Sequence, residues 1–482
     1  MTPIDYNDSI VVLGSGLSGT TVAETLLLHK KKVVMIDVGY EKNNNVKKKE
    51  FLKYKKKFSS PKFKLKEYAY AYSNFFEYNK IKENNFNAIG SLAKGGLSNI
   101  WGASLQPYDE NDLKDFPYNL SHIKNNYKRL TSTLLNKQDL EEDCLISSRN
   151  IDHRCRDLHK GSKKIVDGIT FNLPFNAVAE ESSKYISKDT IYNASMKLKE
   201  LKQDKNFTYI SNKFISNIHK ISDIYTIICK DILSNDIVNY KSKKIFICLG
   251  TISTTHLVLK MMNRLNFKLP LLSTPAGSFM LFSFTKRKHN EKKLVIANLT
   301  FMIERYGPKA SGHLFPFTDS IGELLQIKNY FPFLYRVFDY LIFSRIIIGN
   351  IYYPSKLSDN SIYLDSSENL IINGNNKRNL KAIFSMHIKK IRKLFFKNNL
   401  LLIPGAKLLN PGEDIHYGGT LPISNKYEIS CNENGELKGF KNIFIADSSS
   451  MPYLPGKTHS FNAMAQSMFI AEKALENDIN KI

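Results

Sequence analysis

The stretch IVVLGSGLSG, residues 10–19, decides the fold of this chain. Its first four residues form an apolar run of the kind found in strands buried within a parallel sheet. The GxGxxG motif that follows opens a helical pattern that continues to Leu27, and a second apolar run, Val33–Ile36, ends at Asp37. A strand, a glycine turn, a helix and a second strand ending in an acid predict a dinucleotide-binding α/β unit.

The three glycines of this motif have different tasks. Gly14 permits the tight turn after the strand, Gly16 lets the backbone approach a pyrophosphate, and Gly19 lets the helix pack closely on the strand. The free N–H groups at the start of the helix would then hold the phosphates. Asp37 follows Gly14 by 37 − 14 = 23 residues, where a carboxylate bonds the adenosine ribose hydroxyls. An acid there disfavours NADP, while the motif by itself leaves FAD and NAD both open.

A second glycine cluster, GSLAKGGLSNIWGA, occupies residues 90–103 and contains the only tryptophan of the chain. So many small residues beside Trp101 indicate a loop whose backbone passes close to a flat ligand. An ordinary surface loop is the alternative, but such a loop would rarely be so apolar. The candidate ligand contacts in this loop are Gly95, Gly96, Ser98 and Trp101.

The C-terminal part of the chain carries the candidate catalytic groups. HYGGT at residues 416–420 is followed by an apolar strand pattern that ends at Asp447, and a proline-rich turn then leads to His459 before a helical pattern. Oxidising an alcohol requires removal of the hydroxyl proton as hydride leaves carbon, and an imidazole with a pKa of about 7 is best suited to take that proton. A second imidazole can position the hydroxyl and share the developing charge. We therefore predict His416 and His459 as catalytic residues.

In this order, the glycine motifs and the C-terminal elements resemble the glucose–methanol–choline (GMC) family of flavin oxidoreductases. The resemblance covers both ends of the chain well, whereas the middle of the chain matches only in general character. It implies FAD as the cofactor, His416 as the active-site histidine and His459 as its partner. Which of the two acts as base stays open, and we favour His416. It also implies that the surroundings of Asp447 bind the ribityl chain and pyrophosphate, and that Ile215 contributes backbone contacts beside the adenine.

The loop at residues 90–103 refines this resemblance. Its Trp-Gly form is similar to the branch that contains pyranose oxidases and sugar dehydrogenases, which implies a sugar or glycoconjugate as substrate. No His or Cys lies near residues 90–105, where such families link the flavin, so FAD is expected to bind without a covalent bond. His256, His387 and most of the other histidines are expected to be structural. For His313 a structural role is favoured, with substrate contact as the alternative.

The order of the elements predicts the domain organisation. The predicted fold class is α/β, with a Rossmann-like FAD-binding domain and a discontinuous α+β substrate domain. The FAD-binding domain is expected to comprise residues 1–45, 88–115, 205–265 and 405–482. A basic helical excursion is expected at residues 46–87. The substrate domain is expected to comprise residues 116–204 and 266–404, with strands near residues 293–305 and a helix near residues 380–398.

The formal net charge of +24 admits two interpretations. Lysines are concentrated in residues 47–66, which would suit a basic face toward anionic membrane lipid, a polyanionic substrate or nucleic acid. The alternative, which we favour, is a compositional bias toward Asn, Lys and Ile throughout the chain. Nucleic acid is not an expected partner, whereas peripheral contact with a membrane surface stays open.

The most apolar long segment, residues 330–353, is interrupted by Arg336, Asp339 and Arg345. A charge at the centre of a bilayer costs about 2.5–3.5 kcal/mol on insertion scales, so a spanning helix is not expected. The segment is expected to pack within the substrate domain, with contact at a membrane interface as the alternative.

The cysteines and the motifs together define the expected function. Five cysteines without CxxC spacing argue against a disulfide framework or a zinc site and favour a reducing, cytoplasmic location. No metal is expected. The sequence predicts an FAD-dependent oxidoreductase that oxidises a CH–OH group of a small-molecule alcohol or sugar by hydride transfer to flavin N5, with the electron acceptor and the oligomeric state open. The alternatives are a flavoprotein mutase or reductase acting on a sugar or lipid, and a basic membrane-surface binding protein on a flavoprotein scaffold.

Overall fold

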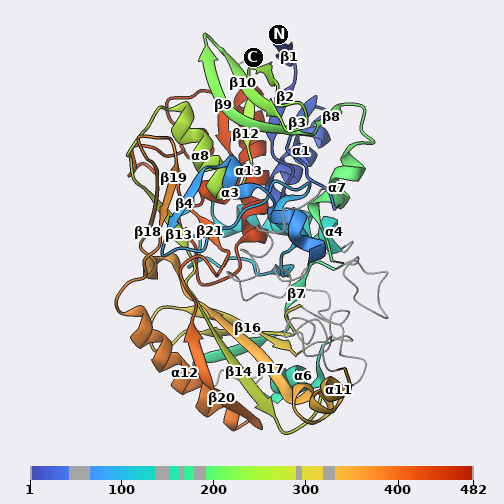
Figure 1. The fold of residues 1–482 in the computed structure, drawn as a ribbon, viewed down its shortest axis with the longest axis vertical. Helices are drawn as coiled ribbons and strands as arrows, with labels where there is room; N and C mark the ends of the chain where they lie inside the picture. Colours follow the sequence, from blue (N-terminus) through green and yellow to red (C-terminus); the bar gives the residue numbers. More distant parts are fainter. Residues whose placement is uncertain are drawn as a thin grey trace.

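The computed structural model confirms the mixed α/β class. The described residues are 3–42, 66–135, 151–161, 168–178, 191–288, 296–317 and 332–479. Figure 1 shows a parallel sheet with its helices in the upper part of the molecule and a large antiparallel sheet in the lower part. The two sheets belong to two separate apolar cores.

The upper sheet contains five strands, all of them parallel. In spatial order they are β22 (Ile443–Ile445), β12 (Ile245–Ile247), β2 (Ile10–Leu13), β3 (Val33–Ile36) and β8 (Phe207–Ile210). Every residue of β22, β12, β2 and β3 is buried, as expected for strands covered on both faces. β2 and β3 have the bounds of the two apolar runs, so both strand predictions are confirmed.

Helices pack on this sheet through their apolar faces. They are α1 (Leu17–Leu28), α4 (Leu120–Leu135), α7 (Ala194–Leu201), α8 (Thr251–Met261) and α13 (Ser460–Ile479). α1 packs against α13 and α7, and α4 packs on α13. Residues 116–204 were expected in the substrate domain, but α4 and α7 of this segment lie in the upper part because their apolar residues join its core.

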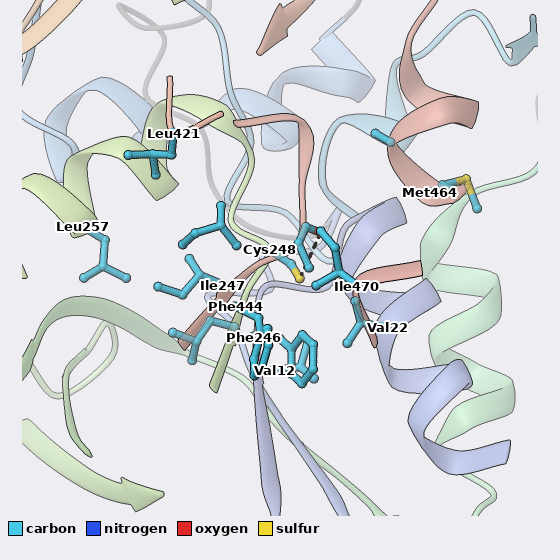
Figure 2. Close-up of a cluster of buried hydrophobic side chains, with 14 of the residues drawn as sticks. Val12, Val22, Phe246, Ile247, Cys248, Leu257, Leu421, Phe444, Met464 and Ile470 are labelled. Carbon is cyan, nitrogen blue, oxygen red and sulfur yellow. Dashed lines mark hydrogen bonds between the residues drawn. The ribbon is translucent and has the colours of Figure 1, made fainter. Parts of the chain in front are cut away.

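The upper core combines side chains from strands and helices. Val12, Phe246 and Phe444 come from neighbouring strands and lie together in Figure 2, with the rings of Phe246 and Phe444 stacked at a centroid distance of 4.9 Å. Val22 of α1 and Ile470 of α13 reach the same cluster. Because protein cores are densely packed, this cluster fixes the strand ends from which the functional loops emerge.

The lower sheet contains six strands, all antiparallel. In spatial order they are β20 (Leu400–Leu408), β14 (Ala276–Ser283), β17 (Ile346–Tyr352), β16 (Ala310–Pro316), β15 (Leu299–Ile303) and β6 (Ile169–Asn172). α12 (Leu380–Phe396) packs on this sheet with Phe279, Phe301 and Phe395 in its core, and α6 (His153–Gly161) packs near β6. The helix predicted near residues 380–398 and the strand predicted near residues 293–305 are confirmed.

Smaller sheets accompany these two sheets. One is mixed, in the order β21 (Tyr417–Gly418), β13 (Leu269–Ser273), β18 (Asn360–Leu364), β19 (Leu370–Asn373) and β4 (Ile81–Asn84). Another consists of β1 (Ile4–Asp5), β11 (Ile237–Ser242), β10 (Ile224–Asp231) and β9 (Lys213–Ile221). β5 (Ser104–Leu105) pairs with β7 (Phe175–Asn176).

The expected basic excursion at residues 46–87 is described only in part. Residues 46–65 lie outside the described residues, and the rest contains the 3-10 helix η2 (Lys66–Tyr72), the short helix α3 (Phe75–Tyr78) and β4. Short 3-10 helices also occur as η3 (Gly96–Asn99), η7 (Phe343–Arg345), η8 (Ser355–Leu357) and η9 (Ser448–Ser450). The described part of the excursion is therefore helical at first and ends in a strand.

The apolar segment at residues 330–353 forms two different elements. Its first part is the surface helix α11 (Pro332–Leu341), and its second part is the strand β17, whose Ile347 and Ile351 are fully buried. Packing within the lower part is thus confirmed for β17, whereas α11 exposes most of its described apolar side chains. Within the described residues, none of the helices combines the length and the apolar character needed to cross a membrane.

Candidate functional site

A cavity of about 550 Å³ lies where the parallel strands end. Its wall includes Gly14 after β2, Asp37 after β3, Cys248 after β12 and Asp447 after β22. Its volume falls within the ~300–1,000 Å³ range of ligand pockets. Open α/β sheets bind ligands at the carboxyl ends of their strands, so the fold places this cavity where a ligand is expected.

The glycines of the first motif differ in what surrounds them. A Cβ on Gly14, which has φ +95°, would lie 2.6 Å from the carbonyl oxygen of Cys248, and a Cβ on Gly19 would lie 2.0 Å from that of Gly14. Around a Cβ on Gly16, by contrast, no atom lies within 4 Å. Packing therefore requires glycine at Gly14 and Gly19, whereas Gly16 opens its backbone to the cavity that it lines together with Gly14.

The second glycine loop lies against the first. Gly95 and Gly96 both have positive φ angles, of +86° and +60°, and a Cβ on Gly96 would lie 3.2 Å from Cα of Gly16. The Ser98 hydroxyl donates to the Gly95 carbonyl at 2.5 Å and accepts the Ala194 N–H at 3.0 Å. Gly96 and Ser98 line the cavity. Gly95 is not among the lining residues, and its carbonyl accepts the hydrogen bond of Ser98.

Trp101 lies apart from the cavity wall. Its indole N–H donates to the backbone carbonyl of Tyr192 at 2.8 Å, and Trp101 is not among the residues that line the cavity. In this structure the side chain ties the second glycine loop to the segment that leads into α7. Leu92 and Leu97 of the same loop line the cavity, as does Ile89 directly before it.

Asp37 is a buried acid in the cavity wall. Its carboxylate accepts a short hydrogen bond from the hydroxyl of Ser15 and a longer one, of 3.3 Å, from Tyr209. Ser15 also accepts the Gly95 N–H at 3.0 Å, so Asp37 couples the two glycine loops. Burial raises the pKa of Asp37 to about 7, against the effect of these donors. Ile215, the residue predicted beside the adenine, lies in β9 and lines the same cavity.

Asp447 organises the loop that follows β22. Its carboxylate accepts the Gly250 N–H at 2.9 Å, the Thr254 hydroxyl at 2.6 Å and the Ser449 N–H at 2.9 Å. These donors offset the burial that raises its pKa. Because its oxygens accept hydrogen bonds from the protein, Asp447 shapes the cavity wall through the backbone that it holds.

His416 and His459 meet although 43 residues separate them (459 − 416 = 43). Their ring centroids are 5.1 Å apart and their planes cross at 85°. His459 directly precedes α13 and lines the cavity, whereas His416 lies beside it, outside the lining residues. The neighbouring Lys457 is buried and binds Asp112 at 2.5 Å, which holds the turn before α13 in place. The structure thus brings together the two predicted catalytic residues.

A buried hydrogen-bond chain lies behind His416. Its Nδ1 is 3.0 Å from Oγ1 of Thr274, and this hydroxyl is 3.4 Å from Oδ2 of Asp414, which also accepts the Thr274 N–H at 2.9 Å. A hydroxyl has a single proton to donate. When Thr274 donates it to an ionised Asp414, the Nδ1–H of His416 donates to Thr274, and Nε2 keeps its lone pair. Burial raises the pKa of Asp414 to about 7.

Neither Thr274 nor Asp414 was predicted from the sequence as part of the site. Asp414 stands two residues before His416, and this proximity was the one available signal. Thr274 follows β13, and the pairing of β13 with β21 through Ser273 and Tyr417 brings it to His416 from 142 residues away. No local pattern in the sequence indicates that pairing.

His313 lies in one cluster of rings with His416 and Tyr352, although a structural role was favoured for it. The ring of Tyr352 lies 5.6 Å from His313 and 4.8 Å from His416. Nε2 of His313 is buried and has no hydrogen-bond partner in the described structure. By contrast, His387 bonds the Tyr353 hydroxyl and a backbone carbonyl within the lower core, in line with a structural role.

Both candidate catalytic histidines are neutral at pH 7. Burial lowers the pKa of His416 well below its ordinary value, and the nearby His459 and His313 lower it further. Burial alone lowers the pKa of His459 to about 4. A neutral imidazole has a free lone pair that can accept a proton, but the lowered pKa makes each ring a weaker base than the imidazole with a pKa of about 7 that was expected for this role.

Three buried polar atoms in the cavity wall lack a hydrogen-bond partner among the described residues. They are Oγ of Ser253, Nε2 of His256 and Nδ1 of His459. Leaving a buried polar atom unsatisfied costs about 1–3 kcal/mol, so such atoms suit a polar ligand. His256, expected to be structural, is thereby part of the cavity wall.

Comparisons with known proteins do not assign the site. Neither the scan against protein-family models nor the search of curated proteins gave a match to this sequence. Across the described ranges, no group of three or more His, Cys, Asp and Glu side chains is arranged to hold a metal ion. The site is therefore interpreted from its own residues.

Proposed function

We propose that this protein is an FAD-dependent oxidoreductase of the GMC type that oxidises a CH–OH group of a sugar or glycoconjugate. The observation that carries the proposal is the contact between His416 and His459 beside a cavity lined by both glycine loops. A dinucleotide bound in this cavity would supply the hydride acceptor and a neutral imidazole would accept the hydroxyl proton, and hydride transfer from an alcohol needs both functions. The sugar preference rests on the resemblance of residues 90–103 to sugar-oxidising enzymes.

The residues of the cavity fit FAD. The open backbone at Gly16 and the start of α1 would hold the pyrophosphate, Asp37 would hold the ribose, and the backbone of Ile215 would contact the adenine. The unpartnered atoms of Ser253 and His459 would face polar groups of the same ligand. When bound, FAD supplies a hydride acceptor at N5.

The two histidines have separate roles in this proposal. The Thr274 hydroxyl and the Asp414 carboxylate hold the proton of His416 on Nδ1, which leaves Nε2 to accept the proton of the substrate hydroxyl. His459 positions that hydroxyl. The positive end of the helix dipole at the start of α13, directly after His459, would stabilise negative charge that develops on the reduced flavin.

The proposal is tested by anaerobic reduction of the purified protein with a panel of sugars and simple alcohols. The expected result is a yellow protein whose flavin absorbance is bleached by at least one member of the panel. Turnover of a sugar or lipid without bleaching would favour the mutase alternative. A colourless protein that does not bind added FAD would contradict the proposal.

Thr274→Val is expected to slow this flavin reduction about tenfold. The substitution keeps the volume of the side chain but removes a hydrogen bond, worth ~0.5–1.5 kcal/mol, and ~1.4 kcal/mol corresponds to a factor of ten. Thr274→Ser keeps the hydroxyl and is the matched control, with a rate near that of the wild type. Equal rates of flavin reduction for Thr274→Val and the wild type would exclude the proposed role of the hydrogen-bond chain behind His416.

The hydrogen-bond chain of His416, Thr274 and Asp414 also predicts how the rate of flavin reduction depends on pH. As the pH rises through about 7, Asp414 loses its proton and draws the Thr274 hydroxyl, so the reactive tautomer of His416 gains population and the rate rises. His416 itself is already neutral in this range. Asp414→Asn should remove the rise near pH 7, and stopped-flow reduction between pH 6 and pH 8 measures it. A rise that persists in Asp414→Asn would have to come from another group.

A further inference from the structure

Helix α11 presents its apolar side chains outward. Phe333 is 76% exposed, Tyr340 is 65% exposed and Leu341 is 53% exposed. Val337 and Phe338 are exposed as well. A surface helix of a globular protein ordinarily turns its apolar face to the core, so the orientation of α11 is the reverse of the usual one.

A buried ion pair fixes this orientation. Asp339 of α11 binds the guanidinium of Arg287 at 2.7 Å, and the two side chains are only 8% and 1% exposed. The backbone N–H of Arg287 also donates to the carbonyl of Ser344, just after the helix, at 2.8 Å. Breaking a buried ion pair is strongly unfavourable, so α11 cannot turn its apolar side inward without a large cost.

Basic residues surround the exposed apolar side. The Nζ atom of Lys286 lies 3.2 Å from the centre of the Tyr340 ring, and the guanidinium of Arg345 lies 5.9 Å from that of Phe282. Arg336 is exposed on α11 itself. In residues 281–288 and 332–345, Asp339 is the one acid, against two Lys and three Arg. The net charge of these two segments is therefore 5 − 1 = +4.

We propose that α11 is an interfacial helix that seats its apolar side chains in the surface of an anionic lipid bilayer. Helices of this kind combine exposed aromatic and aliphatic residues with surrounding cations and lie in the plane of the membrane surface. A second copy of the same face would bring like charges together, whereas anionic headgroups complement them. This inference does not depend on the proposed redox function.

The position of α11 relates the membrane surface to the catalytic cluster. Figure 1 shows α11 at the lower end of the molecule, far from the parallel sheet. β17 begins shortly after α11 and ends at Tyr352, whose ring lies 4.8 Å from that of His416. The seven residues of β17 span about 20 Å in an extended strand. The catalytic histidines would therefore lie within about one strand length of the lipid surface.

The test is sedimentation of the full-length protein with vesicles. Vesicles of phosphatidylcholine alone are compared with vesicles of equal parts phosphatidylcholine and phosphatidylglycerol. The wild type is expected to bind the anionic vesicles and to be released when salt is raised from about 0.1 M to about 1 M, where screening shortens the Debye length from ~10 Å to ~3 Å. The double variant Phe333→Glu/Leu341→Glu should lower the ratio of bound to free protein at least tenfold.

The matched control is the double variant Leu28→Glu/Ile221→Glu. Both of these residues are exposed aliphatics, 68% and 66% exposed, in the upper part of the molecule. The control should bind vesicles as the wild type does. Equal binding by the α11 variant and the wild type would overturn the proposal. So would a dimer in light scattering that α11 substitution dissociates while no vesicle binding is seen, because the helix would then face a second copy. Flavin content measured in the same samples tests the redox proposal separately.

Discussion

His416→Ala is expected to slow anaerobic reduction of FAD by substrate by about 10²–10⁴-fold, the usual contribution of a general base. The variant should keep its FAD, because His416 lies outside the residues that line the cavity. In the proposed mechanism its neutral imidazole, which is hydrogen-bonded to Thr274 and through it to Asp414, accepts the proton of the substrate, and alanine offers no replacement. The measurement is single-turnover flavin bleaching in stopped flow, with the flavin content determined from the absorbance of the same sample.

His387→Ala is the matched control for this prediction. His387 is fully buried and bonds the Tyr353 hydroxyl and a carbonyl in the lower core, so its loss should lower thermal stability and leave the reduction rate near that of the wild type. His459→Ala should reduce both the rate and the affinity for FAD, since His459 lines the cavity. Unimpaired reduction in His416→Ala would exclude His416 as the base.

The sequence predicted the elements that depend on short-range patterns. β2 and β3 lie where two apolar runs were read, because strands buried on both faces have a continuous apolar sequence. The close packing of Gly19 on Gly14 was also predictable, since it follows from the local geometry of the strand–turn–helix motif. The contact between the rings of His416 and His459 was foreseen only through the order of motifs typical of a family.

The remaining parts of the site depend on pairing between distant strands. Thr274 reaches His416 because β13 pairs with β21, and His313 reaches the cluster because β16 pairs with β17, which carries Tyr352. Such pairings have no local signal in the chain. The orientation of α11 was likewise not predictable from the sequence. The sequence shows an apolar segment that contains an acid, but it does not show that Asp339 pairs with the buried Arg287.

Gly16→Asp is expected to weaken FAD binding at least 100-fold without loss of the fold. Gly16 precedes α1 with φ −68° and ψ −175°, an extended conformation open to any residue, and a Cβ there meets no atom within 4 Å. Asp is a preferred residue at this cap position, so the FAD-free protein should unfold at or above the wild-type temperature. The new carboxylate would lie against the pyrophosphate, and a like-charge pair at about 5 Å costs ~3 kcal/mol at an effective dielectric constant of ~20.

Gly19→Ala should destabilise the FAD-free protein, which Gly16→Asp should not do, and this contrast makes the prediction specific. Its Cβ would lie 2.0 Å from the backbone oxygen of Gly14, so the strand and helix must move apart, and overpacking of this kind costs about 1–3 kcal/mol or more. The FAD-free protein should therefore unfold several degrees earlier, as scanning fluorimetry would measure. Leu28→Asp places the same new charge at the exposed end of α1. It should change neither the affinity for FAD nor the unfolding temperature much. If fluorescence titration shows that Gly16→Asp binds FAD as tightly as Leu28→Asp does, the pyrophosphate does not lie at this loop.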